Sequence, residues 1–531
     1  MMHHTARWKG ARRRIAAAGL ALGLALTVAA CGGSDSSSGD GGTPTKGGEL
    51  KVGLGTDVAR LNPGSASPGS QAVLGAIYDY LMVVEHRGEE PKPNLATAMT
   101  PSDDFMTWTM TLPTGKKFSD GEPFNAEAVK FNFDQFKDPE TGSGLVSALS
   151  GLESVEAPDE STVVFNLSEA DATFPVLLAN QEGVAAAYVA SPKSLQEHTD
   201  DFNANAAGMG PYKITSWSQG GAEVVVEKNE NYWDGADKVL LDKITFRKIE
   251  DPQSAYQAVR AGDVDIIYSI FSSVIKQASN DSSVKVAMGV GADQSSIVLN
   301  MTKPPFDDIR MRQAMSMAID REEITAIVKE GLTYESTSLF PPDDPWNGGA
   351  ANPAYDPERA KELIAEYEAE NGKVPFTYTC RPTVDDTTVV EQQLRKAGFD
   401  FKVEVQETTA ALEAFFSGKY TATCWNMADF LDPGTLPYQF FHSSGNNNTG
   451  GFENPEFDAL VDQAKSTADL EERKKLWQQA DEILVEELPW VWRTGQPVAF
   501  IYRPTVHSVA LDEPDRLRGR VIDTRHMWVE D

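Results

Sequence analysis

Two kinds of hydrophobic pattern alternate along the chain after residue 48, one typical of strands and the other typical of capped helices. In residues 105–112, apolar side chains at every second position are separated by threonines, and this period of two predicts a half-buried strand. The same criteria predict further strands at residues 50–54, 162–167, 222–227, 243–248 and 264–268.

Helix starts are marked by a capping residue ahead of apolar residues at helical spacing. Asn454-Pro455-Glu456 and Asp356-Pro357-Glu358 each combine a cap residue, a first-turn proline and an acid. Asp320 with Glu323 has the pattern of a capping box, in which each side chain satisfies the other residue's backbone N–H. Two further helices are expected after Asn125 and after Asp307 or Asp308.

One part of the chain has the order strand, helix, strand, helix, strand. This order predicts a small parallel sheet and places the protein in the α/β fold class. Such sheets bind ligands at the carboxyl ends of their strands, so the residues after the third strand are candidate pocket residues. The predicted strands are 376–380, 401–405 and 420–425, and the predicted helices are 384–397 and 408–416.

Residues 1–30 differ in composition from the rest of the chain. Their charged residues are all Arg or Lys, and residues 15–30 form an unbroken run of apolar and small side chains. This order predicts a signal peptide, because the run is too short to span a membrane as a mature helix. Sec export is expected, and the Arg12-Arg13 pair leaves twin-arginine export open.

The end of the signal peptide, Val28-Ala29-Ala30-Cys31, resembles the lipobox of bacterial lipoproteins, whose cysteine is lipidated and becomes the new N-terminus. The alternative is an ordinary signal peptide followed by an unrelated cysteine. Residues 31–47 hold no apolar residue after Cys31, which predicts a flexible tether. The resemblance implies a lipid anchor on the extracytoplasmic face of the bacterial cell membrane.

Length, charge and motifs narrow the possible functions. The 531 residues predict two to four domains, and the 79 Asp and Glu against 47 Lys and Arg disfavour nucleic-acid binding. There is no GxSxG, HExxH, CxxC or P-loop motif, and the seven histidines show no pair at metal-binding spacing. The sequence therefore points to no catalytic residue, no metal site and no cofactor, although it does not exclude an enzyme.

Short blocks in a shared order carry a family resemblance from Gly47 to about Arg503. The clearest is FSDGEPFNAEAV at residues 118–129, with Glu127 where the pattern usually has Asp. The chain resembles the family 5 extracytoplasmic solute-binding proteins of ABC importers, which include oligopeptide-, dipeptide- and nickel-binding receptors. The other blocks are residues 47–50, 61–63, 77–81, 93–96, 208–212, 231–233, 305–314 and 318–321.

The resemblance implies a two-lobed, periplasmic-binding-protein-like clamp of type II, from the large cluster with an extra inserted subdomain. Lobe one would comprise residues 48–297 and 494–531, with the subdomain inserted at about 78–207, and lobe two residues 298–493. A ligand held between the lobes would favour the closed form, which membrane permease subunits recognise. The expected protein is a monomer that binds a peptide or another small molecule and meets the membrane through its lipid anchor.

The residues after the third strand of the α/β unit resemble a ligand-binding segment of the family. Peptide-binding members have W-x-x-D-[YF]-x-[DE]-P there, and its first Asp pairs with the α-amino group of the ligand. By that match Asp429 is the candidate ammonium anchor, although three residues instead of two separate it from Trp425. The alternative is an Asp that caps the next turn.

Three aromatic residues near this strand end, Trp425, Phe430 and Tyr438, are candidates for ligand contact, with packing in the lobe core as the alternative. A partner for a ligand carboxylate stays open among Arg381, Arg395 and Arg493.

Cys380 and Cys424 lie in the first and third strands of the α/β unit, which are neighbours if the strand order is 2-1-3. Export favours oxidation, so a disulfide between them is a hypothesis. The alternative is two free thiols, because directly cross-strand disulfides are often strained.

Together these observations predict a lipid-anchored receptor that captures a short peptide and delivers it to an ABC permease. An oligosaccharide or a chelated nickel ion in the same fold is the first alternative, and a secreted surface hydrolase is the second. The aromatic residues leave sugars open, the scattered histidines disfavour nickel, and no nucleophile and base pattern supports a hydrolase.

Overall fold

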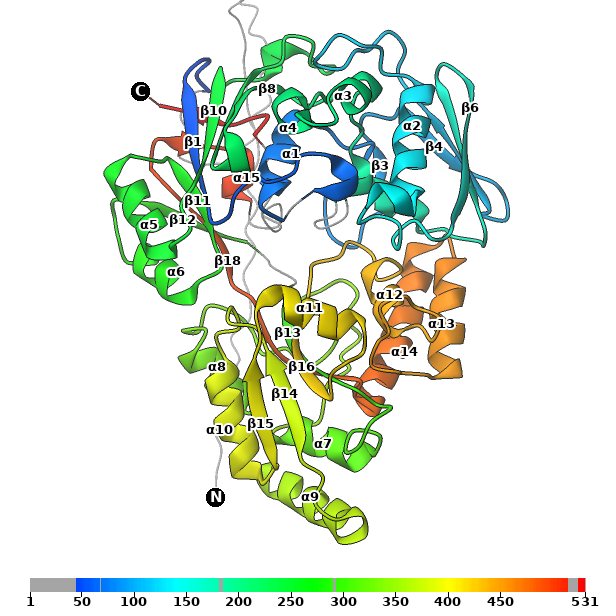
Figure 1. The fold of residues 1–531 in the computed structure, drawn as a ribbon, viewed down its shortest axis with the longest axis vertical. Coiled ribbons are helices and arrows are strands. Elements are labelled where there is room, and N and C mark those ends of the chain that lie inside the picture. The colour runs from blue at the N-terminus through cyan, green and yellow to red at the C-terminus, as the bar shows by residue number, and fades with distance from the viewer. Residues whose placement is uncertain (1–43, 67, 181–184, 290–292, 514–523, 531) are drawn as a thin grey trace, which may run out of the picture. The chain divides into compact units, whose positions relative to one another are not determined.

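Three β-sheets of four or more strands organise the part of the chain that the structure, a computed structural model, describes: residues 44–66, 68–180, 185–289, 293–513 and 524–530. The predicted signal peptide, Cys31 and most of the predicted tether lie outside these residues. The α/β fold class predicted from the sequence is confirmed, because the described chain combines helices with sheets that contain parallel strand pairs (Figure 1).

The largest sheet has seven strands in the order β12-β18-β11-β1-β10-β9-β8 (Figure 1). Its central strand β1 runs parallel to β10 and β11, and the other pairs are antiparallel. The strands are β1 (Glu49–Leu54), β8 (Tyr212–Trp217), β9 (Glu223–Lys228), β10 (Lys243–Lys248), β11 (Ile266–Ser269), β12 (Lys285–Gly289) and β18 (Val498–Tyr502).

Helices cover this sheet through two separate apolar cores. Tyr256 and Val259 of α5 (Pro252–Ala261) and Ile275 of α6 (Ser272–Ser279) are buried, and α5 joins one core with Ile267 and Ile501 of the sheet. Val73 and Leu74 of α1 belong to the other core. The smaller elements nearby are α1 (Gln71–Ile77), α3 (Pro192–Glu197), α4 (Phe202–Asn205), α15 (Val509–Asp512), β19 (Val506–His507) and β20 (Trp528–Val529).

The second sheet has four antiparallel strands in the order β4-β5-β7-β6, all formed by residues between the first two strands of the large sheet. Trp108 and Met110 are buried while the intervening threonines are partly or fully exposed, as the period of two predicts. One helix, α2 (Ala126–Lys137), buries Val129, Phe133 and Phe136 against this sheet. The strands are β4 (Ala98–Pro101), β5 (Thr107–Thr111), β6 (Leu152–Asp159) and β7 (Thr162–Leu167); β2 (Met82–Val83) pairs with β3 (Lys92–Pro93) beside them.

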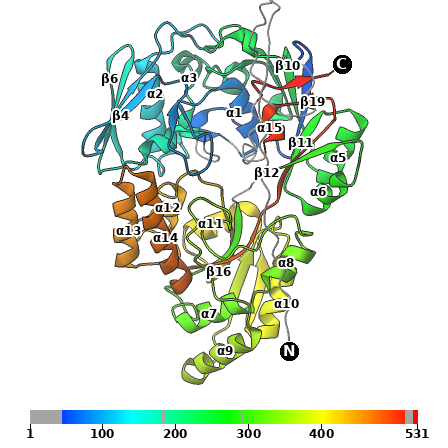
Figure 2. The same ribbon diagram turned by 180° about the vertical axis from the view of Figure 1, so that it is seen from behind.

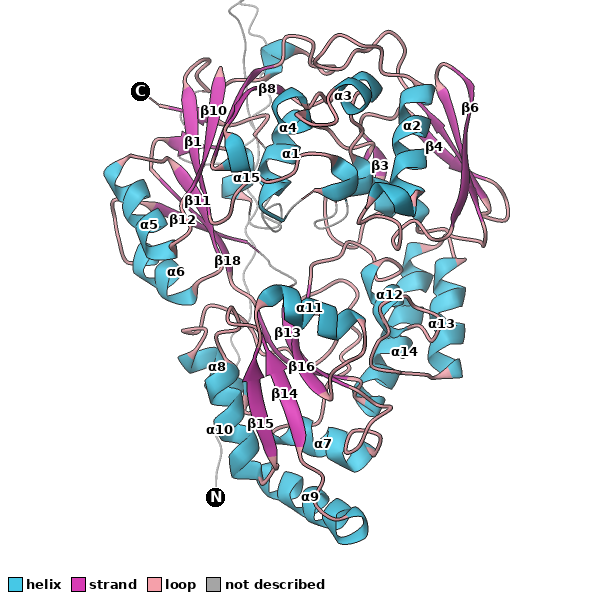
Figure 3. Ribbon diagram, viewed as in Figure 1, coloured by secondary structure: helices cyan, strands magenta, loops and turns pink. Residues whose placement is uncertain are grey.

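The third sheet has five strands in the order β15-β14-β16-β13-β17. Figure 3 shows β15, β14, β16 and β13 together in this region. The three strands of the predicted α/β unit are adjacent and parallel, in the 2-1-3 order. β13 completes the sheet by pairing antiparallel with β16 and β17. The strands are β13 (Gln294–Leu299), β14 (Phe376–Cys380), β15 (Phe401–Val405), β16 (Ala422–Met427) and β17 (Trp490–Gly495).

The helices of this region lie on the two faces of the five-stranded sheet. Ala422 and Cys424 of β16 face one core, which also contains side chains of α7, α9 and α10, whereas Trp425 and Met427 face the core with α11 to α14. Both Figure 1 and Figure 2 show α12 and α13 beside the four-stranded sheet. The helices are α7 (Ile309–Ala318), α8 (Arg321–Ile327), α9 (Pro357–Asn371), α10 (Thr387–Ala397), α11 (Thr408–Phe416), α12 (Leu436–Phe441), α13 (Pro455–Lys465) and α14 (Leu470–Glu487).

Most of the predicted helix caps are confirmed by side-chain hydrogen bonds. Asn454, Asp356 and Asn125 each accept from backbone N–H groups of the first turn, and Asp308 caps α7. The predicted capping box is only half formed. The Asp320 carboxylate accepts from the N–H of Glu323, but the amide side chain of Gln393 accepts from the N–H of Asp320 and donates to Glu323.

The chain passes twice between the seven-stranded and five-stranded sheets. The first connection lies between the end of β12 at Gly289 and the start of β13 at Gln294, and the second between β17 and β18 at residues 496 and 497. The predicted lobe boundaries at 297/298 and 493/494 fall inside β13 and β17, and the division into two lobes stays a prediction.

Candidate ligand-binding site

Asp429 stands just beyond the carboxyl end of β16 and is 7% exposed. Its backbone N–H donates to Oδ1 of Asp293, which precedes β13, at 2.7 Å. Because β13 and β16 are paired strands, this hydrogen bond holds Asp429 beside the first connection between the two larger sheets.

The carboxylate of Asp429 binds a cation supplied by the chain itself. Arg87, from the segment between β2 and β3, donates through Nη1 to Oδ1 of Asp429 and to the carbonyl of Phe430. Its Nε forms an ion pair with Oδ2 of Asp344, and its guanidinium lies 4.5 Å from the centre of the Phe430 ring. The Arg87 side chain is 12% exposed, so this cation is largely removed from solvent.

The segment that carries Arg87 is held by contacts on both sides. Gly88 has φ +77° and packs so closely on Pro345 that an added Cβ would lie 2.7 Å from the proline Cβ. Glu90 accepts from Nη2 of the buried Arg473 at 2.9 Å, and Nε of Arg473 is 3.4 Å from Asp432. These contacts fix the segment against the helices of the five-stranded sheet.

Burial dominates the electrostatics around Arg87. It raises the pKa of Asp344, with Arg87 opposing the shift and Asp429 adding to it. Burial likewise raises the pKa of Tyr334, whose neighbours are the same arginine and carboxylates. The single guanidinium of Arg87 therefore pairs with two carboxylates. Two carboxylates at such close range favour a cation between Asp344 and Asp429.

Trp425 does not lie against Asp429. Its ring stacks on Phe415 of α11 with ring centres 3.7 Å apart, and the guanidinium of Arg381 lies 5.4 Å from the Trp425 ring centre. Arg381 directly follows β14, the strand next to β16. Its Nε is buried without a hydrogen-bond partner, and no carboxylate of the described residues pairs with it. Burial lowers the pKa of Arg381.

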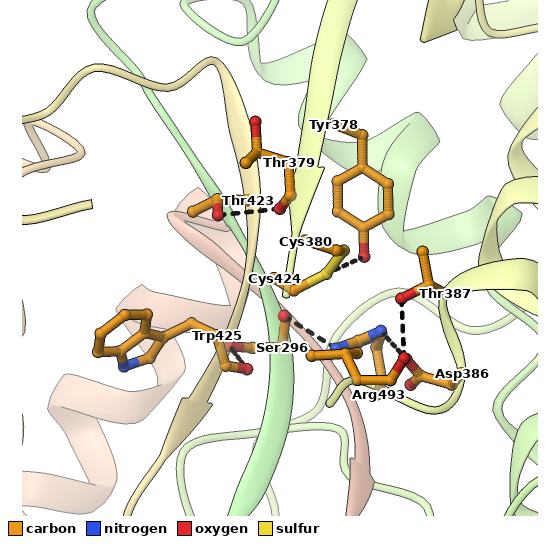
Figure 4. The surroundings of a disulfide bond; sticks show 11 residues. Ser296, Tyr378, Thr379, Cys380, Asp386, Thr387, Thr423, Cys424, Trp425 and Arg493 are labelled. Atoms are coloured by element: carbon orange, nitrogen blue, oxygen red, sulfur yellow. Dashed lines mark hydrogen bonds and ion pairs between the residues drawn. A yellow bond between two sulfur atoms is a disulfide. The ribbon is translucent and has the colours of Figure 1, made fainter. Parts of the chain in front are cut away.

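The other two arginines considered for a ligand carboxylate have partners within the chain. Arg493 of β17 is fully buried and binds Oδ1 of Asp386 at 2.5 Å and the Ser296 carbonyl at 3.2 Å (Figure 4). Arg395 pairs with Glu391 on the outer face of α10 at 2.7 Å. Of the three arginines, Arg381 is therefore the one whose guanidinium is not already paired with a carboxylate of the described residues.

Tyr438 belongs to a different environment. Its hydroxyl donates to Asp462 at 2.9 Å, its ring stacks on His442, and Nζ of Lys465 is 4.7 Å from the ring centre. Tyr438 lines a cavity of about 180 Å³ between α12 and the four-stranded sheet. Phe430, by contrast, is buried under Arg87, so of the four predicted residues only Asp429 and Phe430 share one site.

The structure joins Cys380 and Cys424 by a disulfide, with their Cα atoms 5.0 Å apart (Figure 4). The two residues stand in neighbouring parallel strands, β14 and β16, one position beyond the pair Thr379 and Thr423. The Tyr378 hydroxyl lies 3.1 Å from Sγ of Cys424.

Within residues 44–530, apart from the undescribed gaps, no group of three or more His, Cys, Asp or Glu side chains is arranged to hold a metal ion. No helix in the same part of the chain has the length and apolar composition needed to cross a membrane.

Sequence reasoning missed Arg87 and Asp344. The contact between Arg87 and Asp429 joins residues 342 positions apart, and neither Arg87 nor Asp344 stands in a recognisable motif. The one local signal is Gly88 directly after Arg87, and a single glycine does not indicate which distant residue it approaches.

The fold defines a class before any relative is considered: an α/β protein of two larger sheets connected by two chain crossings, with a smaller sheet inserted. The family model "Bacterial extracellular solute-binding proteins, family 5 Middle" matches residues 90–448. The chain belongs to this family, and the resemblance seen in its sequence blocks is confirmed.

Known relatives agree with this assignment. The glutathione-binding protein GsiB of Salmonella typhimurium is 26% identical over 468 residues, covering 83% of this chain and 88% of the relative. The peptide-bound DppA structure from Helicobacter pylori matches with a TM-score of 0.78 and 24% identity, covering 92% and 99% of the two chains. AppA of Bacillus subtilis, with a bound nonapeptide, matches with a TM-score of 0.75 and 22% identity over 92% and 100%. The fold is that of type II periplasmic binding proteins.

Proposed function

We propose that this solute-binding protein is the receptor of an ABC importer and that its ligand is a short peptide. One observation supports a short peptide as the ligand. A buried carboxylate, Asp429, and an arginine that has no carboxylate partner among the described residues, Arg381, stand at the carboxyl ends of the neighbouring strands β16 and β14. This pair is complementary to a ligand with an ammonium group at one end and a carboxylate at the other.

In this proposal Asp429 binds the α-ammonium group and Arg381 binds a carboxylate. Both interactions take place where water is largely excluded, so they contribute more than exposed ion pairs. Trp425 supports the role of Arg381 by holding its guanidinium over the aromatic ring. Phe430 supports the role of Asp429 by forming the apolar floor of the cation position. Tyr438 would contact a longer ligand from the cavity beside α12.

The transport step follows from two lobes that close on the ligand. We assign the seven-stranded and four-stranded sheets to lobe one and the five-stranded sheet to lobe two, with residues 496–497 between β17 and β18 acting as part of the hinge. A ligand that touches both lobes shifts the population toward the closed form, and the ABC permease recognises that form. The receptor acts as a monomer and binds its ligand without catalysis.

The lipobox-like residues before Cys31 support a lipid anchor at the extracytoplasmic face of the bacterial cell membrane. The acidic surface and the predicted tether fit a body that stays in solution beside the membrane.

Calorimetry with trialanine, N-acetyl-trialanine and trialanine amide tests the assignment of the two ends. Asp429→Asn is expected to weaken trialanine at least tenfold while leaving the N-acetyl peptide unchanged. Arg381→Met is expected to weaken trialanine while leaving the amide unchanged. Arg395→Met is the matched control, because this surface arginine is already paired with Glu391.

Loss of affinity for all three peptides in both variants would contradict specific recognition of the two ends. Native mass spectrometry of the purified protein addresses ligand identity directly, because a retained sugar or nickel complex would replace the peptide in this proposal. The NikZ structure from Campylobacter jejuni with Ni(L-His), 24% identical with a TM-score of 0.72 over 87% of this chain and 95% of that one, makes the nickel complex the first alternative to examine.

A further inference from the structure

Arg87 occupies the position at which the ligand ammonium group is proposed to bind. Its guanidinium bridges Asp344 and Asp429, whose side chains are 2% and 9% exposed, and lies over the Phe430 ring. An ammonium group and a guanidinium seek the same partners, namely carboxylate oxygens, a carbonyl oxygen and an aromatic face. This chain presents all three kinds of partner at one point.

We propose that Arg87 is a specificity-determining residue, an internal cation that the ligand ammonium group displaces from a two-carboxylate site made by Asp344 and Asp429. This inference rests on the proposed function and adds Asp344 to the ammonium site. It also makes Arg87 the group against which every amine-bearing ligand competes.

Backbone hydrogen bonds hold Asp344 in the site, as a backbone hydrogen bond holds Asp429. Its Oδ1 accepts from the backbone N–H of Trp346 at 2.8 Å, and its own N–H donates to the Pro341 carbonyl at 3.1 Å. These bonds aim Oδ2 at the guanidinium of Arg87. Removing Arg87 would leave two buried carboxylates that repel one another. Another cation bound between them would relieve this repulsion.

Displacement is feasible because Arg87 is incompletely satisfied where it lies. Its Nη2 is buried and has no hydrogen-bond partner in the part of the chain that the structure describes. A buried donor left unpaired destabilises the state that contains it, so an ammonium group that satisfies all its hydrogens in the same place has an advantage. Arg87 is nevertheless a tethered competitor at an effective concentration on the order of millimolar, and it lowers the apparent affinity of every amine.

The cation site is tested first without any peptide. Arg87→Ala opens the position, and the melting temperature is measured in about 10 mM guanidinium chloride or methylammonium chloride against equal sodium chloride. Both small cations are expected to raise the melting temperature of Arg87→Ala by at least about 1 °C and to leave the wild-type protein unchanged. The double variant Arg87→Ala/Asp429→Asn should lose the response.

Arg310 provides a matched control on the surface. It also lies between two carboxylates, those of Asp308 and Glu370, but its side chain is 25% exposed. Arg310→Ala should not respond to either cation, because exposed charges are already solvated. An equal response of Arg310→Ala and Arg87→Ala, or no response of Arg87→Ala, would overturn the proposal.

Peptide selectivity provides the second test. Arg87→Met removes the charge and keeps an apolar contact with Phe430, so it also serves if Arg87→Ala does not fold. Its affinity for trialanine is expected to rise about tenfold over wild type, with no change for N-acetyl-trialanine. Unchanged or weaker binding of trialanine would show that Arg87 only supports the fold. If neither protein binds any peptide, the proposed function fails, and the small-cation experiment decides the inference alone.

Discussion

Arg493 and Asp386 form an ion pair that is closed to solvent: Nη1 lies 2.5 Å from Oδ1, and the two side chains are 0% and 1% exposed. Burial acts to lower the pKa of Arg493, but Asp386, Tyr378 and Asp385 together outweigh burial, and the pKa is raised. Because Arg493 also donates to the carbonyl of Ser296, the pair ties the start of α10 to β13 and β17.

Removing one partner of this pair is expected to be strongly destabilising. Arg493→Met and Asp386→Asn should each cost about 3–5 kcal/mol, because either change leaves an uncompensated polar group in the core. Scanning calorimetry of the variants measures the cost. The double variant Arg493→Met/Asp386→Asn should recover part of it, and a double variant as unstable as the sum of the singles would contradict the pairing.

Asp481 is expected to make stability depend on pH. It is fully buried on α14 and accepts from the Leu339 N–H at 3.1 Å. Burial raises the pKa of Asp481 from 3.8 to about 7. The folded state thus keeps a proton that the unfolded state releases near pH 4, so stability falls as pH rises from about 4 to about 7.

Asp481→Asn removes this titration and should flatten that part of the pH profile. The difference in melting temperature, variant minus wild type, is expected to increase by a few degrees from pH 4 to pH 8. Calorimetry from pH 4 to pH 8 measures this difference. Parallel pH profiles for the two proteins would show that Asp481 does not cause the pH dependence of stability.

The disulfide between Cys380 and Cys424 closes a loop of 44 residues. Replacing both cysteines with serine should lower stability by about 2–4 kcal/mol, mainly by freeing the unfolded chain. Mass spectrometry after thiol alkylation under native oxidising conditions checks the bond itself, and two alkylated residues at these positions would show it to be absent.

Gly88→Ala should displace the segment that carries Arg87. The new Cβ meets Pro345 in a backbone conformation that already disfavours alanine, so we expect a loss of about 2–4 kcal/mol and altered ligand affinity. Gly115→Ala is the matched control, with φ +71° and open space around the added carbon. Its cost should stay near 1 kcal/mol without any effect on binding, and equal costs for the two variants would contradict the close approach.

Cys31→Ala should prevent lipidation and release the protein from the membrane. Metabolic labelling with a radioactive fatty acid, followed by fractionation of cells, measures both effects. Label on the Cys31→Ala variant would contradict the lipobox assignment.

Local structure was the part of the fold that could be predicted residue by residue. Strands 162–167, 243–248, 376–380 and 401–405 have the predicted bounds in the structure. The third strand of the α/β unit begins and ends two residues later than predicted, because pairing with β13 extends it beyond its apolar run. The half-formed capping box has a similar origin, since the distant residue Gln393 replaces the local partner.

The candidate site was predictable only where a motif marked it. Asp429 and Phe430 stand in such a segment, but their contact with Arg87 and Asp344 joins regions that no local pattern connects. The three arginines proposed for a ligand carboxylate were equivalent until their neighbours were known. Only the structure separates Arg381, which lacks a carboxylate partner among the described residues, from Arg395 and Arg493.

The sequence by itself determined the order of helices and strands, the parallel α/β unit and the family, because periodicity, caps and ordered motifs depend on residues close along the chain. The tertiary structure alone decided which charges meet. Ion pairs such as Arg87 with Asp429 and Arg493 with Asp386 form between segments brought together by the burial of apolar side chains, a driving force that is not directional. The identity of each buried partner is therefore set by the packing of the whole fold.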